Sequence, residues 1–487
     1  MGDGMKSRKF IFILIMVAMA LSFSACGGSS GTSAPAPGGA NQWTWANGAD
    51  VVNQLGTYGT QGTTASSNVP GARQNAVTWA DKAGNLWLFG GLGYGSSGNF
   101  NLLNDLWEYS AGQWTWMSGL NAGGQPGIYG TQGTPALTNI PGARDGAVSW
   151  IDASGNLWLF GGYGYGDSQA AVGVLNDLWE YTPVPQITGQ PFNPGQWTWV
   201  GGSSAVGQPG TYGTLGTAAA GNIPGARDGA VNWIDASGNF WLFGGNGCAS
   251  SATTPCASKD SGNLNDLWEY SAGEWTWVSG SDVVNQSGTY GTLGTAGASN
   301  IPGARFDAVS WIDGSGNFWL FGGSGYDSNP TDLSGNLNDL WEFSAGQWTW
   351  MGGSNVNGQP GTYGTEGTAA ASNVPGARSG AVSWTDSSGN FWLFGGAGLD
   401  SADNSGRLND LWKYGAGQWT WVGGSNVNGQ LGTYGSVGMG GPSNIPGART
   451  LGVSWTDASG NFWLFGGTGY DWLGSNGFLN DLWQFKP

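Results

Sequence analysis

The chain has 487 residues, of which 9% are charged and 13% are aromatic, and its formal net charge is −17. The acidic balance argues against a nucleic-acid partner, because phosphate binding needs a basic surface, and the aromatic content argues against disorder. The sequence has no histidine and three cysteines. This excludes Ser-His-Asp triads, His-ligated zinc or copper, iron–sulfur clusters and imidazole acid–base catalysis.

The N-terminal segment has the pattern of an export signal. A basic stretch at residues 6–9 precedes an apolar run of 14 residues at 10–23, which is too short to span a bilayer comfortably. The run leads into Ser-Ala-Cys at Cys26, which resembles the lipobox of bacterial lipoproteins and implies lipidation of this cysteine. Cleavage near Ala25 without a lipid is the alternative.

These patterns divide the chain into three parts. We expect a signal peptide over residues 1–26, a flexible linker rich in Gly, Ser, Ala and Pro over 27–41, and a repeat domain over 42–487. The protein is then exported and held at the outer membrane or cell surface through a lipid anchor, or is otherwise periplasmic or secreted. We expect the membrane to be contacted only through this anchor.

Three motifs each recur six times within the repeat domain. They are Pro-Gly-Ala-Arg, Asn-Asp-Leu-Trp and a Trp-Thr-Trp triplet. Each copy carries five tryptophans, which leaves only Trp472 of the 31 outside the pattern. The motif arginines are Arg73, Arg144, Arg227, Arg305, Arg378 and Arg449, and the motif aspartates are Asp105, Asp177, Asp266, Asp339, Asp410 and Asp481.

Each copy predicts four short strands. In the second copy they cover residues 144–151, 156–162, 175–181 and 196–200, which are rich in Trp, Val, Leu, Phe and Tyr and partly alternate with period two. The Asp-Ala-Ser-Gly sequence at 152–155 predicts a tight turn between the first two. Four antiparallel strands in each of six copies predict an all-β, six-bladed β-propeller.

The phase of the repeat predicts how the ring closes. A Trp-Thr-Trp triplet ending at Trp45 precedes the first motif arginine, whereas no triplet follows Trp483. We therefore expect the N-terminal strand to supply the outermost strand of the last blade, which removes two free sheet edges.

The repeat resembles the kelch repeat. The Gly161-Gly162 pair after the second strand, the aromatic third strand at 176–181 and the fourth-strand tryptophan carry the resemblance, which extends over residues 42–487. It implies a kelch-type propeller related to galactose oxidase. That enzyme's copper site uses two histidines and a crosslinked Cys–Tyr pair, so the lack of histidine excludes copper oxidase chemistry here, and we expect no catalytic residues of that kind. The resemblance is informative about fold and much less so about function.

The spacing of the motifs predicts two unlike faces. The link from each triplet to the next motif arginine has a constant length of 28 residues and a repeated Tyr-Gly core, so we expect it to form an ordered extra layer over one face. Length varies mainly between the second and third strands. In antiparallel blades these loops and the links emerge on the same side. This loop-rich face is the predicted working surface.

The motif arginines have two interpretations. Each opens an innermost strand on the loop-rich face, so together they could form a ring of guanidinium groups that binds an acidic ligand bidentately. Alternatively, each arginine pairs with the motif aspartate of its own copy as a structural ion pair, which we favour because the two motifs match one to one.

The remaining candidates break the repeat pattern. We expect the repeat tryptophans to be core, and Tyr470 and Trp472 to be ligand contacts. We expect a disulfide between Cys248 and Cys256. No metal ligand set and no cofactor are predicted, although the acidic loops 327–339 and 400–403 contain oxygen ligands of the kind that Ca²⁺ takes.

We expect a monomeric, non-enzymatic binding module for a glycan or a protein ligand. The export signal, the loop-rich face and the missing catalytic set motivate this expectation. One alternative is a sialidase-like glycoside hydrolase, which would need a cluster of free arginines, a tyrosine nucleophile and a carboxylic acid. The other is a structural protein of the cell envelope.

Overall fold

The structure, a computed structural model, describes residues 40–184, 191–250, 255–256, 261–331 and 334–487, all within one compact unit. The expected signal peptide, the lipidation site at Cys26 and the linker up to residue 39 lie outside the described residues. The described residues form β-strands and no helix. None of them therefore forms an apolar helix of membrane-spanning length.

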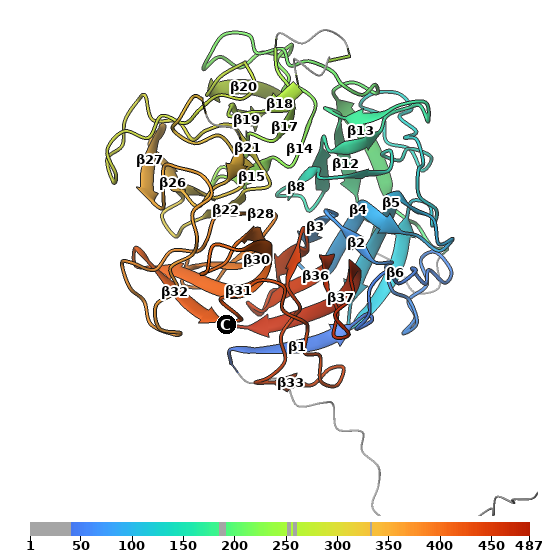
Figure 1. Cartoon of the computed structure of the whole chain (residues 1–487). Helices are drawn as coiled ribbons and strands as arrows, with labels where there is room; N and C mark the ends of the chain where they lie inside the picture. Colours follow the sequence, from blue (N-terminus) through green and yellow to red (C-terminus); the bar gives the residue numbers. More distant parts are fainter. Residues whose placement is uncertain (1–39, 185–190, 251–254, 257–260, 332–333) are drawn as a thin grey trace, which may run out of the picture. The chain divides into compact units, whose positions relative to one another are not determined.

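Each sequence repeat forms an antiparallel four-strand sheet, and the whole is consistent with a β-propeller (Figure 1). The innermost strand of each copy is split in two by a break that leaves its register with the second strand unchanged. These strands are β2 (Arg73–Gln74) and β3 (Val77–Ala80), β7 (Arg144–Asp145) and β8 (Val148–Ile151), β14 (Arg227–Asp228) and β15 (Val231–Ile234), β21 (Arg305–Phe306) and β22 (Val309–Ile312), β28 (Arg378–Ser379) and β29 (Val382–Thr385), and β34 (Arg449–Thr450) and β35 (Val453–Thr456).

The second and third strands lie outward from the first. Either can be split near the loop-rich end of the sheet, which is the end that carries the links and the loops between the second and third strands. The second strands are β4 (Leu86–Tyr94), β9 (Leu157–Phe160) with β10 (Tyr163–Tyr165), β16 (Phe240–Phe243) with β17 (Asn246–Cys248), β23 (Phe318–Phe321) with β24 (Ser324–Gly325), β30 (Phe391–Leu399) and β36 (Phe462–Tyr470). The third strands are β5 (Phe100–Ser110), β11 (Val172–Val174) with β12 (Leu178–Thr182), β18 (Ser261–Asn263) with β19 (Leu267–Ser271), β25 (Gly335–Asn336) with β26 (Leu340–Ser344), β31 (Ser405–Gly415) and β37 (Asn476–Lys486).

The Trp-Thr-Trp triplets form the outermost strands. In the last sheet this strand is β1 from the N-terminus, which pairs antiparallel with β37 in the register Trp43↔Phe485 and Trp45↔Trp483. This is the pairing that the phase of the repeat predicts. The outermost strands are β6 (Gln113–Ser118), β13 (Gln196–Gly201), β20 (Glu274–Ser279), β27 (Gln347–Gly352), β32 (Gln418–Gly423) and β1 (Gln42–Asn47).

The glycine pair that recurs in every repeat explains the break in the second strand. Gly161 and Gly162 have φ angles of 70° and 96°, in the left-handed region that a side chain disfavours. A Cβ on Gly161 would lie 2.8 Å from the carbonyl oxygen of Arg227 in the next repeat. The pair therefore turns the strand while letting a neighbouring backbone approach closely.

The hydrophobic core lies between neighbouring sheets. One cluster packs Trp150 and Phe160 of the second repeat against Phe240 and Trp268 of the third. Such clusters join each repeat to the next, and a further cluster joins the sixth repeat to the first. Burial of large aromatic side chains between sheets provides most of the stabilisation that the repeats give each other.

Each link has two parts. The first part contacts the loops at the loop-rich end, where Gly124 N–H donates to the carbonyl of Leu102 and Gly127 N–H to that of Gly166. The second part runs along the free edge of the outermost strand of the sheet that follows it. Gly294 N–H donates to the carbonyl of Trp350 in β27, and the Asn300 amide donates to the carbonyl of Trp348. In the last sheet this contact includes β33 (Gly440–Gly441), which pairs with β1. The link covers an edge that would otherwise be open to pairing with another chain.

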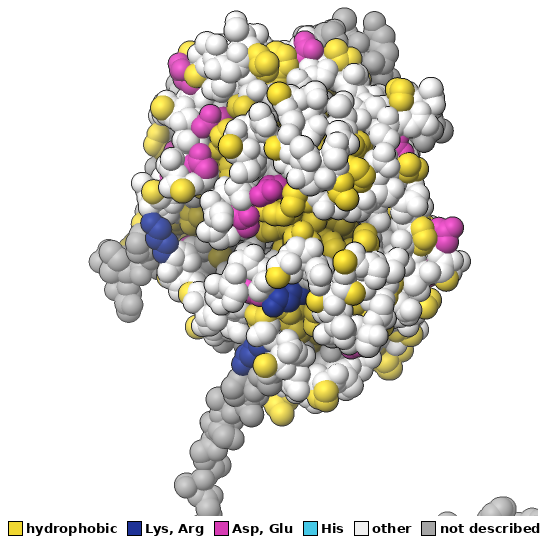
Figure 2. Space-filling view, turned by 90° about the vertical axis from the view of Figure 1, so that its left-hand side faces the viewer, with side chains coloured by type: hydrophobic (Ala, Val, Ile, Leu, Met, Phe, Trp, Pro, Cys, Tyr) yellow, Lys and Arg dark blue, Asp and Glu magenta, His cyan; other side chains and the backbone are white. Residues whose placement is uncertain are grey.

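Few charged side chains reach the surface. On the face shown in Figure 2 they are scattered, whereas hydrophobic side chains gather in a hollow at its centre. This face is therefore dominated by uncharged groups, as expected from a chain with 9% charged residues.

Candidate functional site

Each motif arginine is held in a buried network with the motif aspartate of its repeat. Arg305 in β21 donates from Nη1 and Nη2 to the two carboxylate oxygens of Asp339, both at 2.7 Å. Its Nε and Nη1 also donate to the carbonyls of Gly303 and Gly322, both at 2.9 Å. This bidentate arrangement uses most of the guanidinium donors within the protein.

Two further groups complete the network around the aspartate. Asp339 Oδ2 accepts hydrogen bonds from the Tyr290 hydroxyl at 2.6 Å and from the Trp341 indole at 2.7 Å. Burial, and then the charge of Asp339, raise the pKa of Tyr290 well above its usual value. The tyrosine belongs to the link, which explains why the length of the link does not vary. The other tyrosines in this position are Tyr58, Tyr129, Tyr212, Tyr363 and Tyr434.

The same network in every repeat corrects the interpretation of the arginines as ligand contacts. Their side chains are 1% exposed and the paired aspartates are 0% exposed. Burial lowers the pKa of each arginine, but the adjacent carboxylate more than offsets this. No ring of free guanidinium groups is formed by Arg73, Arg144, Arg227, Arg305, Arg378 and Arg449, so the sialidase-like alternative loses its arginine cluster. The pairs are Arg73–Asp105, Arg144–Asp177, Arg227–Asp266, Arg305–Asp339, Arg378–Asp410 and Arg449–Asp481.

The axis between the sheets is closed by a cycle of backbone hydrogen bonds. In each repeat the break in the innermost strand contains one residue in the left-handed region, with φ between 52° and 63°. The N–H of this residue donates to the carbonyl of the corresponding residue in the preceding repeat, at 2.7–2.9 Å, and Asn75 N–H donates to Leu451 to complete the cycle. The six residues are Asn75, Gly146, Gly229, Asp307, Gly380 and Leu451.

Side chains deeper in the axis reinforce this closure. Ser149 Oγ donates to the carbonyl of Thr78, Asn232 Nδ2 to that of Ser149, and Ser310 Oγ to that of Asn232. A cavity of about 130 Å³ on the axis is lined by the six residues of the cycle and the small residues that follow most of them. The axis is therefore no open channel, and a ligand can only lie on one end of it.

The repeats differ from one another where the sheets meet the loop-rich end. The residue after each motif arginine pairs in register with a residue of the second strand, which pairs with one of the third. The six triplets differ, in contrast to the shared buried network. They are Gln74–Leu92–Leu102, Asp145–Tyr163–Val174, Asp228–Asn246–Asn263, Phe306–Ser324–Asn336, Ser379–Ala397–Arg407 and Thr450–Thr468–Phe478.

We call the six triplets together the axial surface. One part of it is acidic and another part is aromatic. Burial raises the pKa of Asp145 to about 7, with the charges of Asp228 and Asp307 adding to the effect. Burial likewise raises the pKa of Asp228 to about 6 and that of Asp307 to about 7. The opposite sector is aromatic, because Phe478 of the last repeat contacts Phe100 of the first at 4.7 Å between ring centroids.

The sequence analysis overlooked this surface, although its signal was present. The residue after the arginine is Gln, Asp, Asp, Phe, Ser or Thr in the successive copies, directly beside an invariant motif. Variation at one position of a near-identical repeat is what a site on a symmetric scaffold produces. Arg407, the one arginine after the signal outside the repeat motif, belongs to the same surface, and its buried Nε has no hydrogen-bond partner among the described residues.

Tyr470 ends β36, and Trp472 lies in the loop between β36 and β37. Trp472 is 50% exposed beside the more exposed Leu473, so it is available for contact, whereas Tyr470 is half-buried at the end of β36. Asp471 between them is buried, where its Oδ1 accepts the backbone N–H groups of Leu473 and Ser475. The loop is thus braced from within while presenting an indole to solvent.

The acidic loops use their carboxylates in the same way. Asp327 Oδ1 accepts the N–H of Asn329 and its Oδ2 that of Asn357, and Asp400 accepts the N–H groups of Ala402 and Asn404. Among the described residues no three acidic or cysteine side chains gather in a way that could hold a metal ion. Ca²⁺ in these loops therefore has no assembled ligand set within the described part of the chain.

Cys248 and Cys256 form a disulfide in the loop between β17 and β18. The bond holds Pro255 against the link of the third repeat, where Cys256 N–H donates to the carbonyl of Gly207 at 2.8 Å. It thus fastens one loop of the loop-rich end to its neighbour.

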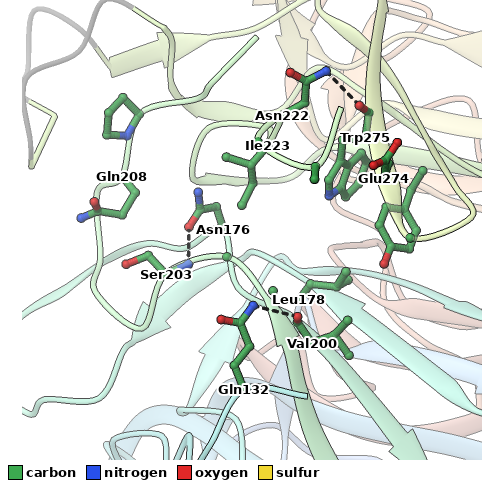
Figure 3. A pocket seen from close by; sticks show the side chains of 17 residues that line it. Gln132, Asn176, Leu178, Val200, Ser203, Gln208, Asn222, Ile223, Glu274 and Trp275 are labelled. Atoms are coloured by element: carbon green, nitrogen blue, oxygen red, sulfur yellow. Dashed lines mark hydrogen bonds between the residues drawn. The ribbon is translucent and has the colours of Figure 1, made fainter. Parts of the chain in front are cut away.

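A pocket of about 630 Å³ lies elsewhere, between the outer parts of the second and third repeats (Figure 3). Figure 3 shows Gln132, Gln208, Asn222 and Glu274 on different sides of it. Several of its polar groups recur in every repeat and serve the fold, for example Asn222, whose amide donates to the carbonyls of Thr217 and Trp275.

Comparisons with known proteins add a likeness of fold. No protein-family description matches the sequence, and no curated protein matches it. One similar solved structure is that of YjhT, with 14% identity and a TM-score of 0.46 over 85% of this chain and 95% of that one. Another is a fungal alcohol oxidase of the AA5 family in complex with copper, with 14% identity and a TM-score of 0.43 over 88% of this chain and 77% of that one.

Proposed function

We propose that this chain is an exported six-bladed kelch-type propeller that binds a glycan or a protein ligand through its loop-rich face without catalysing a reaction. In this proposal β1 closes the last blade, and lipidated Cys26 tethers the propeller to the outer membrane or cell surface. The ligand rests on the axial surface, with Trp472 at its margin.

The variation of the axial triplets carries the proposal. A scaffold that needs only to fold repeats its side chains, as the buried Arg–Asp–Tyr–Trp network does in all six copies. The triplets instead place carboxylates, amides, hydroxyls, aromatic rings and one guanidinium in separate positions around the closed axis. Such a surface can bind one asymmetric ligand specifically, and the closed axis forms the base of the binding site.

The test is a binding screen with variants matched in charge. The purified chain is applied to glycan and protein arrays at about pH 8, above the raised pKa values of Asp145 and Asp228, beside Asp145→Asn/Asp228→Asn, which removes two axial charges. The control is Glu342→Gln/Glu366→Gln, which removes two charges on the third strand β26 and in a link. We expect a ligand that the axial variant loses and the control retains. If no ligand is found, or if both variants bind equally well, the axial surface is not the binding site and the structural envelope alternative gains weight.

A further inference from the structure

The pocket between the second and third repeats differs from the equivalent space in the other repeats. Glu274 opens β20 at a position where the other five copies have glutamine. Gly221 precedes Asn222 where the other copies have serine or threonine. The glutamines are Gln42, Gln113, Gln196, Gln347 and Gln418, and the hydroxyl residues are Ser67, Thr138, Ser299, Ser372 and Ser443.

Both changes act on the same pocket. Glu274 and Gly221 line it together, although 53 residues separate them, as the difference of their numbers shows. Gly221 has no atom within 4 Å of the place that a Cβ would occupy, so the missing side chain leaves open space. The third repeat has thus lost a side chain and gained a carboxylate at one cavity, while its buried network is unchanged.

The remaining polar lining is rich in acceptors. Gln132 donates its amide N–H to the carbonyl of Val200 at 3.0 Å, and Gln208 donates to Val206 at 2.9 Å. One N–H of each amide is used in this way, so each side chain can offer a ligand its oxygen and its second N–H. With the two oxygens of the Glu274 carboxylate, acceptors outnumber donors among these three side chains, which suits a ligand with many hydrogen-bond donors.

Part of the lining is apolar, beside the polar side chains of Asn176, Ser203 and Asn222. Leu178, Ile223 and Trp275 form part of the wall. Its volume of about 630 Å³ lies within the roughly 300–1,000 Å³ of small-molecule sites. Such a lining matches a ligand whose ring carries hydroxyl donors on one side and C–H groups on the other. A ligand with a carboxylate would be repelled by Glu274.

We propose that this pocket binds one residue of a neutral saccharide, with Glu274 accepting hydrogen bonds from ring hydroxyls. It is a second site, on the outer part of the molecule, and it does not depend on the axial surface. Glycine at position 221, in place of serine or threonine in the other repeats, provides the room, and the Glu274 carboxylate provides the strongest acceptor.

The experiment restores the repeat pattern. Saturation-transfer NMR of the purified full chain is recorded with D-glucose, D-galactose, D-mannose and N-acetyl-D-glucosamine, and with D-glucuronate as an anionic comparison. Glu274→Gln/Gly221→Ser gives the third repeat the residues that other repeats already carry, so its thermal unfolding should be unchanged. We expect binding of at least one neutral sugar that this variant weakens about tenfold or more, as for the loss of a charged hydrogen bond.

The outcomes separate this site from the axial one. Gln347→Glu, which places a carboxylate at the matching position of the fourth repeat, is the control and should leave sugar binding as it is. The proposal is overturned if none of the four neutral sugars gives a signal, if D-glucuronate binds as well as they do, or if the restored variant binds normally. A signal abolished only by Asp145→Asn/Asp228→Asn would support the proposed function and refute this pocket.

Discussion

Breaking one buried ion pair should cost far more than the removal of a surface charge. Asp339→Asn keeps the size of the side chain but leaves the Arg305 guanidinium charged and 1% exposed. It also replaces the carboxylate oxygens that accept hydrogen bonds from Tyr290 and Trp341 by an amide, whose N–H₂ group cannot accept them. Loss of one partner of a buried pair typically costs about 3–5 kcal/mol. We expect a decrease of this size in the free energy of unfolding.

The assay is urea unfolding followed by tryptophan fluorescence. Arg305→Met/Asp339→Leu should be less destabilised than Asp339→Asn alone, because the double variant leaves no buried charge. Asp313→Asn, in a half-exposed turn, is the comparison for a carboxylate that is not paired with arginine. A cost below about 1 kcal/mol for Asp339→Asn would show that Arg305 is solvated, and it would revive the arginine ring as an anion site.

Three further predictions concern the axis, the glycine pair and the disulfide. The raised pKa of Asp307, about 7 in the folded protein, means that folding favours its protonated form; its contribution is present below about pH 4 and is lost as pH rises to about 7. As the pH rises from about 4 to about 7, the unfolding midpoint of the unchanged protein should therefore decrease relative to that of Asp307→Asn. If the two midpoints change with pH in parallel, this carboxyl is not buried. Gly161→Ala should lower the free energy of unfolding by about 1–3 kcal/mol, while Gly201→Ala, where a Cβ has open space, should change it little; equal effects would argue against the strained turn. Removing the disulfide with Cys248→Ser/Cys256→Ser, which opens a loop with a sequence separation of 8, should cost about 2–3 kcal/mol in denaturant, and an unchanged midpoint would show that the bond does not form.

Most of the sheet architecture could be predicted because its determinants recur in the sequence. Strand positions followed from apolar alternation, and the partner of β1 followed from the missing triplet after Trp483. The Arg305–Asp339 pair could be anticipated because both motifs occur once in each copy. The third partner, Tyr290, could not, because only the folded link brings its hydroxyl to Asp339 from 49 residues away.

The features that escaped prediction depend on contacts between repeats. The left-handed residue at each break of the innermost strand is Asn, Gly, Gly, Asp, Gly or Leu, so no residue type marks it, and Leu451 adopts this conformation within the hydrogen-bonded cycle. The pocket at Glu274 arises between two sheets. A single exchanged residue carries little meaning until the structure places Gly221 beside it.

Amide hydrogen exchange resolved to single residues gives the most direct test of the closed axis on which the binding surface depends. The amides of Asn75, Gly146, Gly229, Asp307, Gly380 and Leu451 should exchange together and among the slowest in the protein, since each donates within one cycle. Deleting residues 40–47, and with them β1, should accelerate all of them. Fast exchange at Asn75 in the intact protein, with slow exchange at the other five amides, would show that the first and last repeats do not meet, because only the Asn75 N–H donates across that junction.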